Sequence, residues 1–291
     1  HDFPAAFFES ASGFTTTGST AVANVEGLPY SILFWRSFTH WIGGLGIIML
    51  VIIIMPSLGM TGGQLMNLES SLKSKIHPRT QGVGLRLLYV YLGLTIIEIL
   101  LLCLGEMNLF DSICHTFGSV ATGGFSTKNT SLSGYSAYSQ YIVMIFMFLS
   151  GISFVVFYYL VKLNFRKVRQ DEEMWFYILT VLFFGTLAMS VLVANTTRSI
   201  EPAFREGFFQ VISIITTTGY ITTDYLLWPP AGHVILFILL FAGASTGSTT
   251  GSIKMARHLV VIKNIRNVMT KLIHPNVITQ IKLNNKPLSD T

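Results

Sequence analysis

The sequence predicts an all-α integral membrane protein made of repeated helical units. Composition is the first reason: 51% of the 291 residues are hydrophobic and only 11% are charged, whereas soluble domains are about one quarter charged. The second reason is that five apolar stretches are each long enough to cross a bilayer, which takes about 20 helical residues. The third is a short apolar segment, followed by a loop rich in Thr and Gly, that occurs three times.

The long apolar stretches alternate with shorter ones. The long stretches run roughly over 30–56, 84–105, 138–161, 173–194 and 232–262. The short ones cover about 3–14, 109–119 and 203–215, and helices of that length cannot reach across a bilayer. Non-helical backbone persists at membrane depth only where protein buries it or water reaches it. Each short segment therefore predicts a helix that enters the membrane and returns as a loop.

Basic residues are concentrated on one side of the predicted spans. Of the 19 Lys and Arg residues, 14 lie in the segments 57–84, 161–172 and 254–291. Such an excess marks the cytoplasmic side of a membrane protein, so the Thr- and Gly-rich loops face outward. We expect a multi-pass protein of the inner (plasma) membrane. The same distribution explains the net charge of +5 without a nucleic-acid partner.

The short segments and their loops align with one another, and Gly18, Gly123 and Gly219 take equivalent places. Each unit then comprises an outer helix, a pore helix, a filter loop and an inner helix around a pore. About three of four such units are present. The predicted divisions are 1–56 (first unit, without its outer helix), 57–83 (cytoplasmic linker), 84–162 (second unit), 163–172 (cytoplasmic linker), 173–264 (third unit, with a broken inner helix) and 265–291 (cytoplasmic linker toward a fourth unit).

The two ends of the sequence do not match complete units. The chain opens on His1-Asp2-Phe3-Pro4, with neither a start Met nor a basic leader. A ring of three units would leave a gap in the wall of a pore. We therefore expect truncation at both ends, with the fourth filter strand outside the sequence.

The loops have the chemistry of a cation filter. A cation that enters a membrane must exchange its hydration shell for other ligands, which rings of backbone carbonyls supply in known filters. Glycine tolerates the backbone angles that such a loop requires, and threonine hydroxyls can add a ligand or brace the loop. The predicted filter consists of Thr16, Thr17, Gly18, Ala121, Thr122, Gly123, Thr217, Thr218 and Gly219. We expect a transported cation there, and no cofactor or other metal.

The last apolar stretch is interrupted by small polar residues. Gly, Ser and Thr lower helix propensity, so the third inner helix should break below the filter. The interruption comprises Gly243, Ala244, Ser245, Thr246, Gly247, Ser248, Thr249, Thr250 and Gly251. One interpretation is an intramembrane gate, because a lipid-exposed loop is excluded at that depth; the other is close helix packing through small residues. The neighbouring Lys254 anchors this loop, repels cations, or extends to the cytoplasm.

Five stretches of the sequence are distinctive: FFESASGFTTTGST (7–20), FWRSFTHWIGGLGII (34–48), SVATGGFST (119–127), ITTTGYITT (215–223) and AGASTGSTTGSIK (242–254). Together they resemble the membrane subunit of Trk-type potassium uptake systems, in the Trk/Ktr/HKT superfamily of cation transporters. The resemblance implies four units around one pore, a homodimer, and a cytoplasmic nucleotide-binding regulatory subunit of the RCK type. It also implies potassium as the transported ion, because Ser in place of the residue equivalent to Gly18 accompanies sodium preference in some plant members.

Two other functions stay open beside gated translocation. Glu98 lies deep within a predicted span, where it is either functional or the hydrogen-bond partner of another helix. A titratable group there leaves sodium- or proton-coupled potassium cotransport as the alternative. A membrane-embedded enzyme is the distant alternative. Such an enzyme needs a nucleophile with a base, or paired carboxylates, at membrane depth, and the single carboxylate of Glu98 does not meet this requirement. Glu9, near the outer mouth, either concentrates cations or packs a pore helix.

Overall fold

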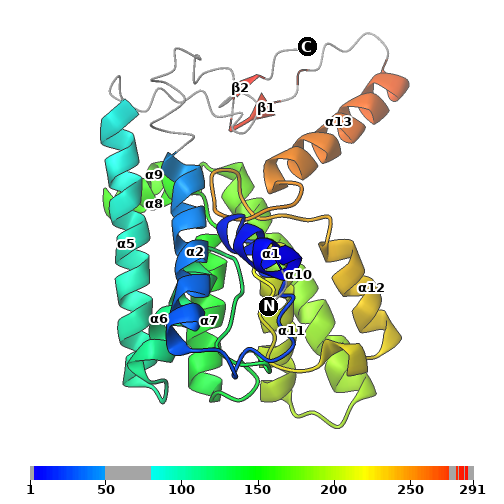
Figure 1. Cartoon of the computed structure of the whole chain (residues 1–291). Coiled ribbons are helices and arrows are strands. Elements are labelled where there is room, and N and C mark those ends of the chain that lie inside the picture. Colours follow the sequence, from blue (N-terminus) through cyan, green and yellow to red (C-terminus); the bar gives the residue numbers. More distant parts are fainter. Residues whose placement is uncertain (1–2, 50–79, 275–279, 281, 285, 288–291) are drawn as a thin grey trace.

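The computed structural model of the chain describes residues 3–49, 80–274, 280, 282–284 and 286–287. Figure 1 shows them as a bundle of helices, with α13 (Met255–Ile273) leaving the bundle at the end where the strands β1 (Lys282–Leu283) and β2 (Lys286–Pro287) lie. Three predicted parts fall wholly or partly outside the described residues. These are 50–56 of the first inner helix, 57–79 of the linker that follows it, and much of the final segment 275–291.

Three short helices occupy the predicted re-entrant segments. They are α1 (Phe3–Phe14), α6 (Leu109–Val120) and α11 (Ile200–Ile215). The start of α6 is fixed by Asn108, whose side chain accepts a hydrogen bond from the backbone amide of Asp111. This bond satisfies one of the amides that have no partner within the first turn. Each short helix ends directly before one of the Thr- and Gly-rich loops.

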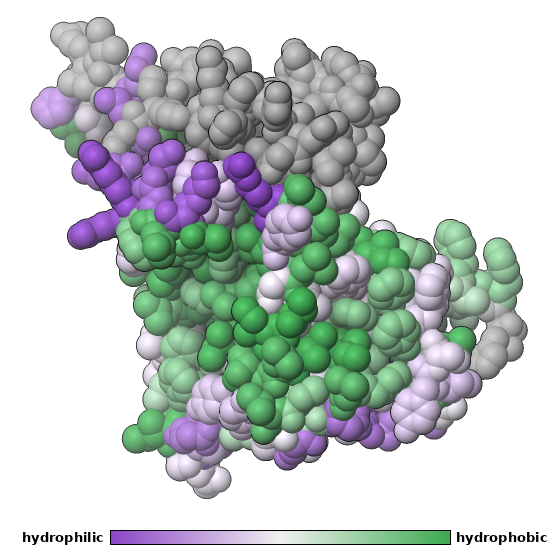
Figure 2. All heavy atoms as spheres, turned by 90° about the vertical axis from the view of Figure 1, so that its left-hand side faces the viewer, coloured by the Kyte–Doolittle hydropathy of each residue, from purple (hydrophilic) through white to green (hydrophobic). Residues whose placement is uncertain are grey.

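Two of the described helices are long and apolar enough to cross a membrane without a break. They are Leu85–Leu104 within α5 (Thr80–Leu104), and α10 (Glu172–Asn195). A third helix, α2 (Tyr30–Met49), is described as far as Met49. The exposed side chains along α5 include Leu85, Tyr89, Ile96, Ile97, Leu100 and Leu104. Figure 2 shows a broad apolar band on this face, with hydrophilic residues above and below it, as lipid contact requires.

The apolar stretch 138–161, which is long enough to cross a bilayer, is not one continuous helix. α7 (Ala137–Ser150) and α8 (Phe154–Val161) meet at an angle of 100°. The backbone groups released at the bend pair with the segment that follows α12 (Pro230–Leu239) and precedes α13. Gly151 O accepts from the Ser245 amide at 3.0 Å, and the Phe154 amide donates to Gly247 O at 3.1 Å. The helix therefore breaks where another non-helical segment replaces its missing hydrogen bonds.

The third inner helix is interrupted as predicted. α12 (Pro230–Leu239) and α13 (Met255–Ile273) are separated by a loop whose two ends meet in a bridge between Ala242 and Ile253. We call residues 242–254 the inner loop. The remaining described elements are α9 (Phe165–Arg169), the 3-10 helix η2 (Tyr225–Leu227), and the antiparallel strands β1 (Lys282–Leu283) and β2 (Lys286–Pro287), with Lys282 opposite Pro287.

The short helices α6 and α11 are mostly buried among longer helices, whereas α1 is mostly exposed. α1 packs against α2, α6 packs against α2 and α5, and α11 packs against α7 and α10. The contact between α10 and α11 depends on Gly185, because a methyl group there would lie 2.5 Å from the ring of Phe208. The Phe208 side chain is buried, so it lies directly against the α10 backbone and cannot move away into solvent.

Substitution of Gly185 tests this packing. We expect Gly185→Ala to destabilise the protein by about 1–3 kcal/mol, because the added methyl group overpacks a buried ring. The matched control is Gly93→Ala on α5, where no described atom lies within 4 Å of the added methyl group. Thermal unfolding of the detergent-solubilised protein provides the measurement. Equal melting temperatures for the two variants would contradict the predicted packing.

Candidate functional site

Each short helix ends in a loop with the same backbone conformation. One threonine in each loop has a positive φ angle: 53° at Thr16, 54° at Thr122 and 54° at Thr217. A glycine two residues later also has a positive φ angle, with 77° at Gly18, 80° at Gly124 and 84° at Gly219. This region is accessible to glycine but is rare and strained for a β-branched residue. The same strain in three places marks the loops as a candidate functional site.

The conformation corrects the alignment of the second loop. We predicted that Gly123 is equivalent to Gly18, but the glycine with a positive φ angle is Gly124. Two consecutive glycines made both registers possible in the sequence, and matching the Thr-Gly pair selected the wrong one. Gly124 is therefore a loop residue that the sequence reasoning missed.

Hydrogen bonds inside the loops support the corrected register. The amide of Gly123 donates to Gly118 O at 2.8 Å. The same bond recurs at 2.9 Å from Thr17 to Ser12 O and from Thr218 to Ser213 O. Gly123 thus occupies the place of Thr17 and Thr218, and it lacks their hydroxyl. Those two hydroxyls contact Thr15 Oγ1 and Thr216 Oγ1, each at 2.8 Å, so they brace their own loops.

The three loops lie next to one another. A methyl group on Gly18 would lie 1.8 Å from the carbonyl oxygen of Gly123, and one on Gly124 would lie 1.9 Å from that of Thr218. In each case a carbonyl of one loop directly faces the glycine of the preceding loop. On Gly219, by contrast, a methyl group would meet no described atom within 4 Å. The first loop therefore adjoins the second and the second adjoins the third, while the glycine of the third has an open side.

A buried polar group from α2 supports the second loop. The imidazole of His40 is fully buried, lies against Gly123, and stacks on the Phe125 ring with 4.0 Å between ring centroids. The guanidinium group of Arg36 lies over the Phe125 ring, and its central carbon is 4.2 Å from the ring centroid. An ion pair of 2.7 Å joins Arg36 to Glu9 of α1.

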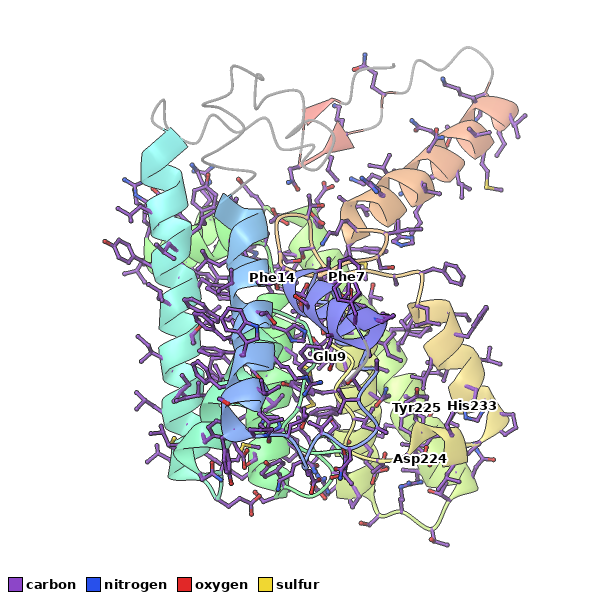
Figure 3. The ribbon with its side chains drawn as sticks, viewed as in Figure 1. Phe7, Glu9, Phe14, Asp224, Tyr225 and His233 are labelled. Carbon is purple, nitrogen blue, oxygen red and sulfur yellow. The ribbon has the colours of Figure 1, made fainter. Side chains whose placement is uncertain are left out.

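Glu9 fits the packing role rather than that of a free mouth carboxylate. Besides Arg36, its carboxylate accepts hydrogen bonds from Thr20 Oγ1 at 2.7 Å and from the Ala21 amide at 3.0 Å. Figure 3 shows Glu9 on α1, apart from Asp224 and Tyr225 at η2 and from His233 on α12. Glu9 therefore fastens the chain after the first loop to the helices α1 and α2.

The inner loop is in direct contact with the second and third Thr-Gly loops. Thr122 Oγ1 donates to Thr249 Oγ1 at 3.2 Å, and the Gly251 amide donates to Thr217 Oγ1 at 2.8 Å. Both contacts use the strained threonine of a loop. Most of the predicted gating residues are buried, and the exposed ones are Gly247 and Gly251.

Two charged side chains hold the inner loop in place. Glu173, at the start of α10, is only 3% exposed. Its Oε1 accepts from the amide of Thr246 at 2.5 Å, from the hydroxyl of Thr246 at 2.8 Å and from the Ala256 amide at 3.2 Å. Lys254 Nζ donates to the carbonyl and, at 3.0 Å, to the hydroxyl of Thr250. Lys254 is the last residue of the inner loop and braces the loop from within, whereas Glu173 fastens it to α10 and is a residue that the sequence reasoning missed.

Glu98 lies behind the second loop rather than in it. The carboxyl group is fully buried on α5 and accepts a hydrogen bond of 2.6 Å from Ser119 Oγ of α6. Its second oxygen, Oε2, has no hydrogen-bond partner among the described residues. The contact with Ser119 matches the interpretation of Glu98 as a link between two helices.

Two further histidines, His115 and His233, contact backbone carbonyls or a hydroxyl group. His115 places one ring nitrogen 2.8 Å from Asp111 O and the other 2.9 Å from Ser126 Oγ, and His233 Nε2 lies 3.0 Å from Tyr225 O. Across residues 3–49 and 80–274, no group of three or more His, Cys, Asp or Glu side chains is placed to hold a metal ion.

Comparisons with known proteins agree with this architecture. All residues, 1–291, match the TrkH family of proteins, described as cation transport proteins. The potassium uptake protein TrkI of Halomonas elongata is 33% identical over 98% of this chain and 58% of its own length. For TrkH of Escherichia coli the identity is 36%, over 98% of this chain and 60% of its own length.

A solved structure shows the same fold. The crystal structure of the potassium transporter TrkH from Vibrio parahaemolyticus matches with a TM-score of 0.86 and 32% identity, over 99% of this chain and 60% of that one. The chain thus spans about 60% of the length of the relatives it matches. The match covers the long helices, the short helices and every loop described above. The chain belongs to the TrkH family of membrane cation transport proteins.

Proposed function

We propose that this chain carries potassium ions across the membrane, and that its three Thr-Gly loops are three of four strands of one selectivity filter. The observation that carries the proposal is the succession of loops in which the carbonyls of Gly123 and Thr218 face the glycine of the neighbouring loop. Backbone carbonyls gathered in this way can replace the hydration shell of a cation. The potassium uptake named for the relatives supports potassium as the ion.

The short helices favour a cation at the same place. A helix carries partial negative charge at its C-terminal end, within its last turn. α1, α6 and α11 all end at the loops, so three such ends are directed at one region. Because the loops themselves contain no Asp or Glu, an ion held there can leave again, as conduction requires.

The proposed architecture has four units, with the divisions predicted from the sequence. A fourth loop would adjoin the open side of Gly219 and close the ring. In this arrangement the basic segments, including α9 with Arg166, Lys167 and Arg169, face the cytoplasm and the filter faces outward. By the family resemblance, we also propose that the protein forms a homodimer and binds a cytoplasmic nucleotide-binding subunit of the RCK type.

We further propose that the inner loop is the gate. Two observations support this proposal. The inner loop contacts Thr122 and Thr217, and most of its residues are buried. A helix contact through small residues would not need the two hydrogen bonds that Glu173 accepts from Thr246 of this segment. Opening would move small side chains only, and it would cost the bonds to the two threonines and to Glu173.

Gly18 provides the test of the filter. We expect Gly18→Ser to lower the ratio of potassium to sodium uptake at least ~tenfold, a factor that corresponds to ~1.4 kcal/mol of lost discrimination. Position 18 has a φ angle of 77°, and the added side chain would lie 1.8 Å from Gly123 O. The control is Gly134→Ser in an exposed outer loop, where the nearest atom is 4.0 Å away. Uptake by cells that lack other potassium transporters is measured, and unchanged selectivity of Gly18→Ser would remove this glycine from the filter.

Glu173 provides the test of the gate. Glu173→Ala removes three hydrogen bonds from the inner loop and the start of α13, each worth about 1.5–3 kcal/mol when the acceptor is charged. We therefore expect potassium leak through the closed protein to rise at least ~tenfold. The adjacent Glu172→Ala is the control, because Glu172 pairs with Lys263 outside the inner loop. Rubidium flux into proteoliposomes measures the leak, and equal leak in both variants would argue against a gate in this segment.

Coupled cotransport is the second candidate, favoured by the buried, half-partnered carboxyl group of Glu98. If Glu98 only links α5 to α6, Glu98→Gln should keep the dependence of potassium uptake on external pH, because Gln retains an acceptor for Ser119. Uptake across pH steps is compared between the variant and the parent protein. Loss of the pH dependence in Glu98→Gln alone would instead support proton coupling.

A further inference from the structure

The carbonyl that follows each loop glycine accepts a hydrogen bond from a hydroxyl group. In the first loop Ser12 Oγ donates to Ser19 O at 2.6 Å. In the third loop Ser213 Oγ donates to Tyr220 O, also at 2.6 Å. Ser12 and Ser213 occupy equivalent places, because their own carbonyls both accept the amide hydrogen bond described above. Each serine therefore fixes the peptide that leaves the loop.

The second loop lacks this serine. Its equivalent residue is Gly118, and the carbonyl to be held belongs to Phe125. The hydroxyl of Tyr220, from the third loop, lies 2.9 Å from Phe125 O and 3.1 Å from His115 O. The Tyr220 side chain is fully buried. A hydroxyl donor is thus present at the same carbonyl in all three loops, although in the second it comes from a neighbouring loop.

Gly118 and Tyr220 are sterically matched. A methyl group on Gly118 would lie 2.1 Å from Tyr220 Oη and 3.1 Å from Phe125 O. Any side chain at position 118 would therefore exclude the tyrosine hydroxyl, whereas a serine there would itself reach the carbonyl. Phe125 O can thus accept a hydrogen bond either from a serine at position 118 or from Tyr220, but not from both. In this chain the donor is Tyr220, which joins the second loop to the third.

We propose that Tyr220 is a positioning residue for potassium selectivity, which holds the second loop in register with the third. Tyr220 accepts from Ser213 through its own carbonyl and donates to Phe125 O through its side chain. Displacement of the third loop is thereby transmitted to the peptide after Gly124, whose backbone has a φ angle of 80°. The inference rests on the proposed filter function and adds to it the residue that keeps two of its strands aligned.

Variants at positions 118 and 220, made in the protein at its native length, test the proposal. We expect Tyr220→Phe to lower the ratio of potassium to sodium uptake about fivefold, because one hydrogen bond to a buried carbonyl is lost. In the Tyr220→Phe background, Gly118→Ser should restore most of the selectivity, since its hydroxyl can reach Phe125 O once the ring yields by a few tenths of an ångström. The matched control is Gly118→Ala in the same background, which adds the same carbon without the hydroxyl and should not restore it.

We expect the same ranking in thermal unfolding: the double variant with Gly118→Ser should have a higher melting temperature than the double variant with Gly118→Ala. If Tyr220→Phe alone does not reach the membrane, this comparison of melting temperatures tests the role of Tyr220. The proposal is overturned if Tyr220→Phe keeps the parent selectivity, or if the two double variants are equal in selectivity and in melting temperature. Measurements on the parent protein distinguish a failure of the proposed function from a failure of the proposed role of Tyr220. Non-selective uptake by the parent contradicts the proposed function, whereas a selective parent with a selective Tyr220→Phe variant contradicts only the role of Tyr220.

Discussion

Non-helical backbone inside a membrane must find hydrogen-bond partners within the protein, because lipid offers none. The rest of this structure depends on that constraint. The second and third Thr-Gly loops and the inner loop are mostly buried among the helices, and hydrogen bonds join the inner loop to both of these Thr-Gly loops. The inner loop pairs with the break between α7 and α8, with Thr217 and with Glu173. The Thr-Gly loops fold back onto the last turns of their own short helices.

The constraint also explains the strained and the glycine positions. A threonine with a positive φ angle is maintained only where its surroundings over-determine it. At Thr122 and Thr217 those surroundings include the inner loop itself, so the backbone conformation of the proposed filter and the placement of the proposed gate are physically connected. Gly18 and Gly124 are required because a carbonyl of the next loop occupies the space where a side chain would begin.

Much of the fold could be predicted from the sequence, because apolar length and Thr-Gly punctuation are local signals. The short helices and the interruption near Gly243 follow from them. The bend at Gly151 could not be predicted in this way: Gly and Ser within an apolar stretch fit a continuous helix as well as a broken one, and the partners Ser245 and Gly247 are distant in sequence. The exact register of the second loop, and the roles of Glu173, His40 and Tyr220, depend on contacts between units in the same way. The only sequence feature that points to Tyr220 is Gly118, because the other two units have a serine at the equivalent position.

The central claim is that the carbonyls of the three loops hold the transported ion. Anomalous diffraction from crystals of the native-length protein soaked in rubidium or thallium, which replace potassium, tests it most directly. We expect an anomalous peak within coordination distance of the carbonyl oxygens of Thr17, Gly123 and Thr218, and we expect this peak to disappear when sodium replaces potassium throughout. A protein that transports potassium but shows its ion peak away from these three carbonyls would contradict the account.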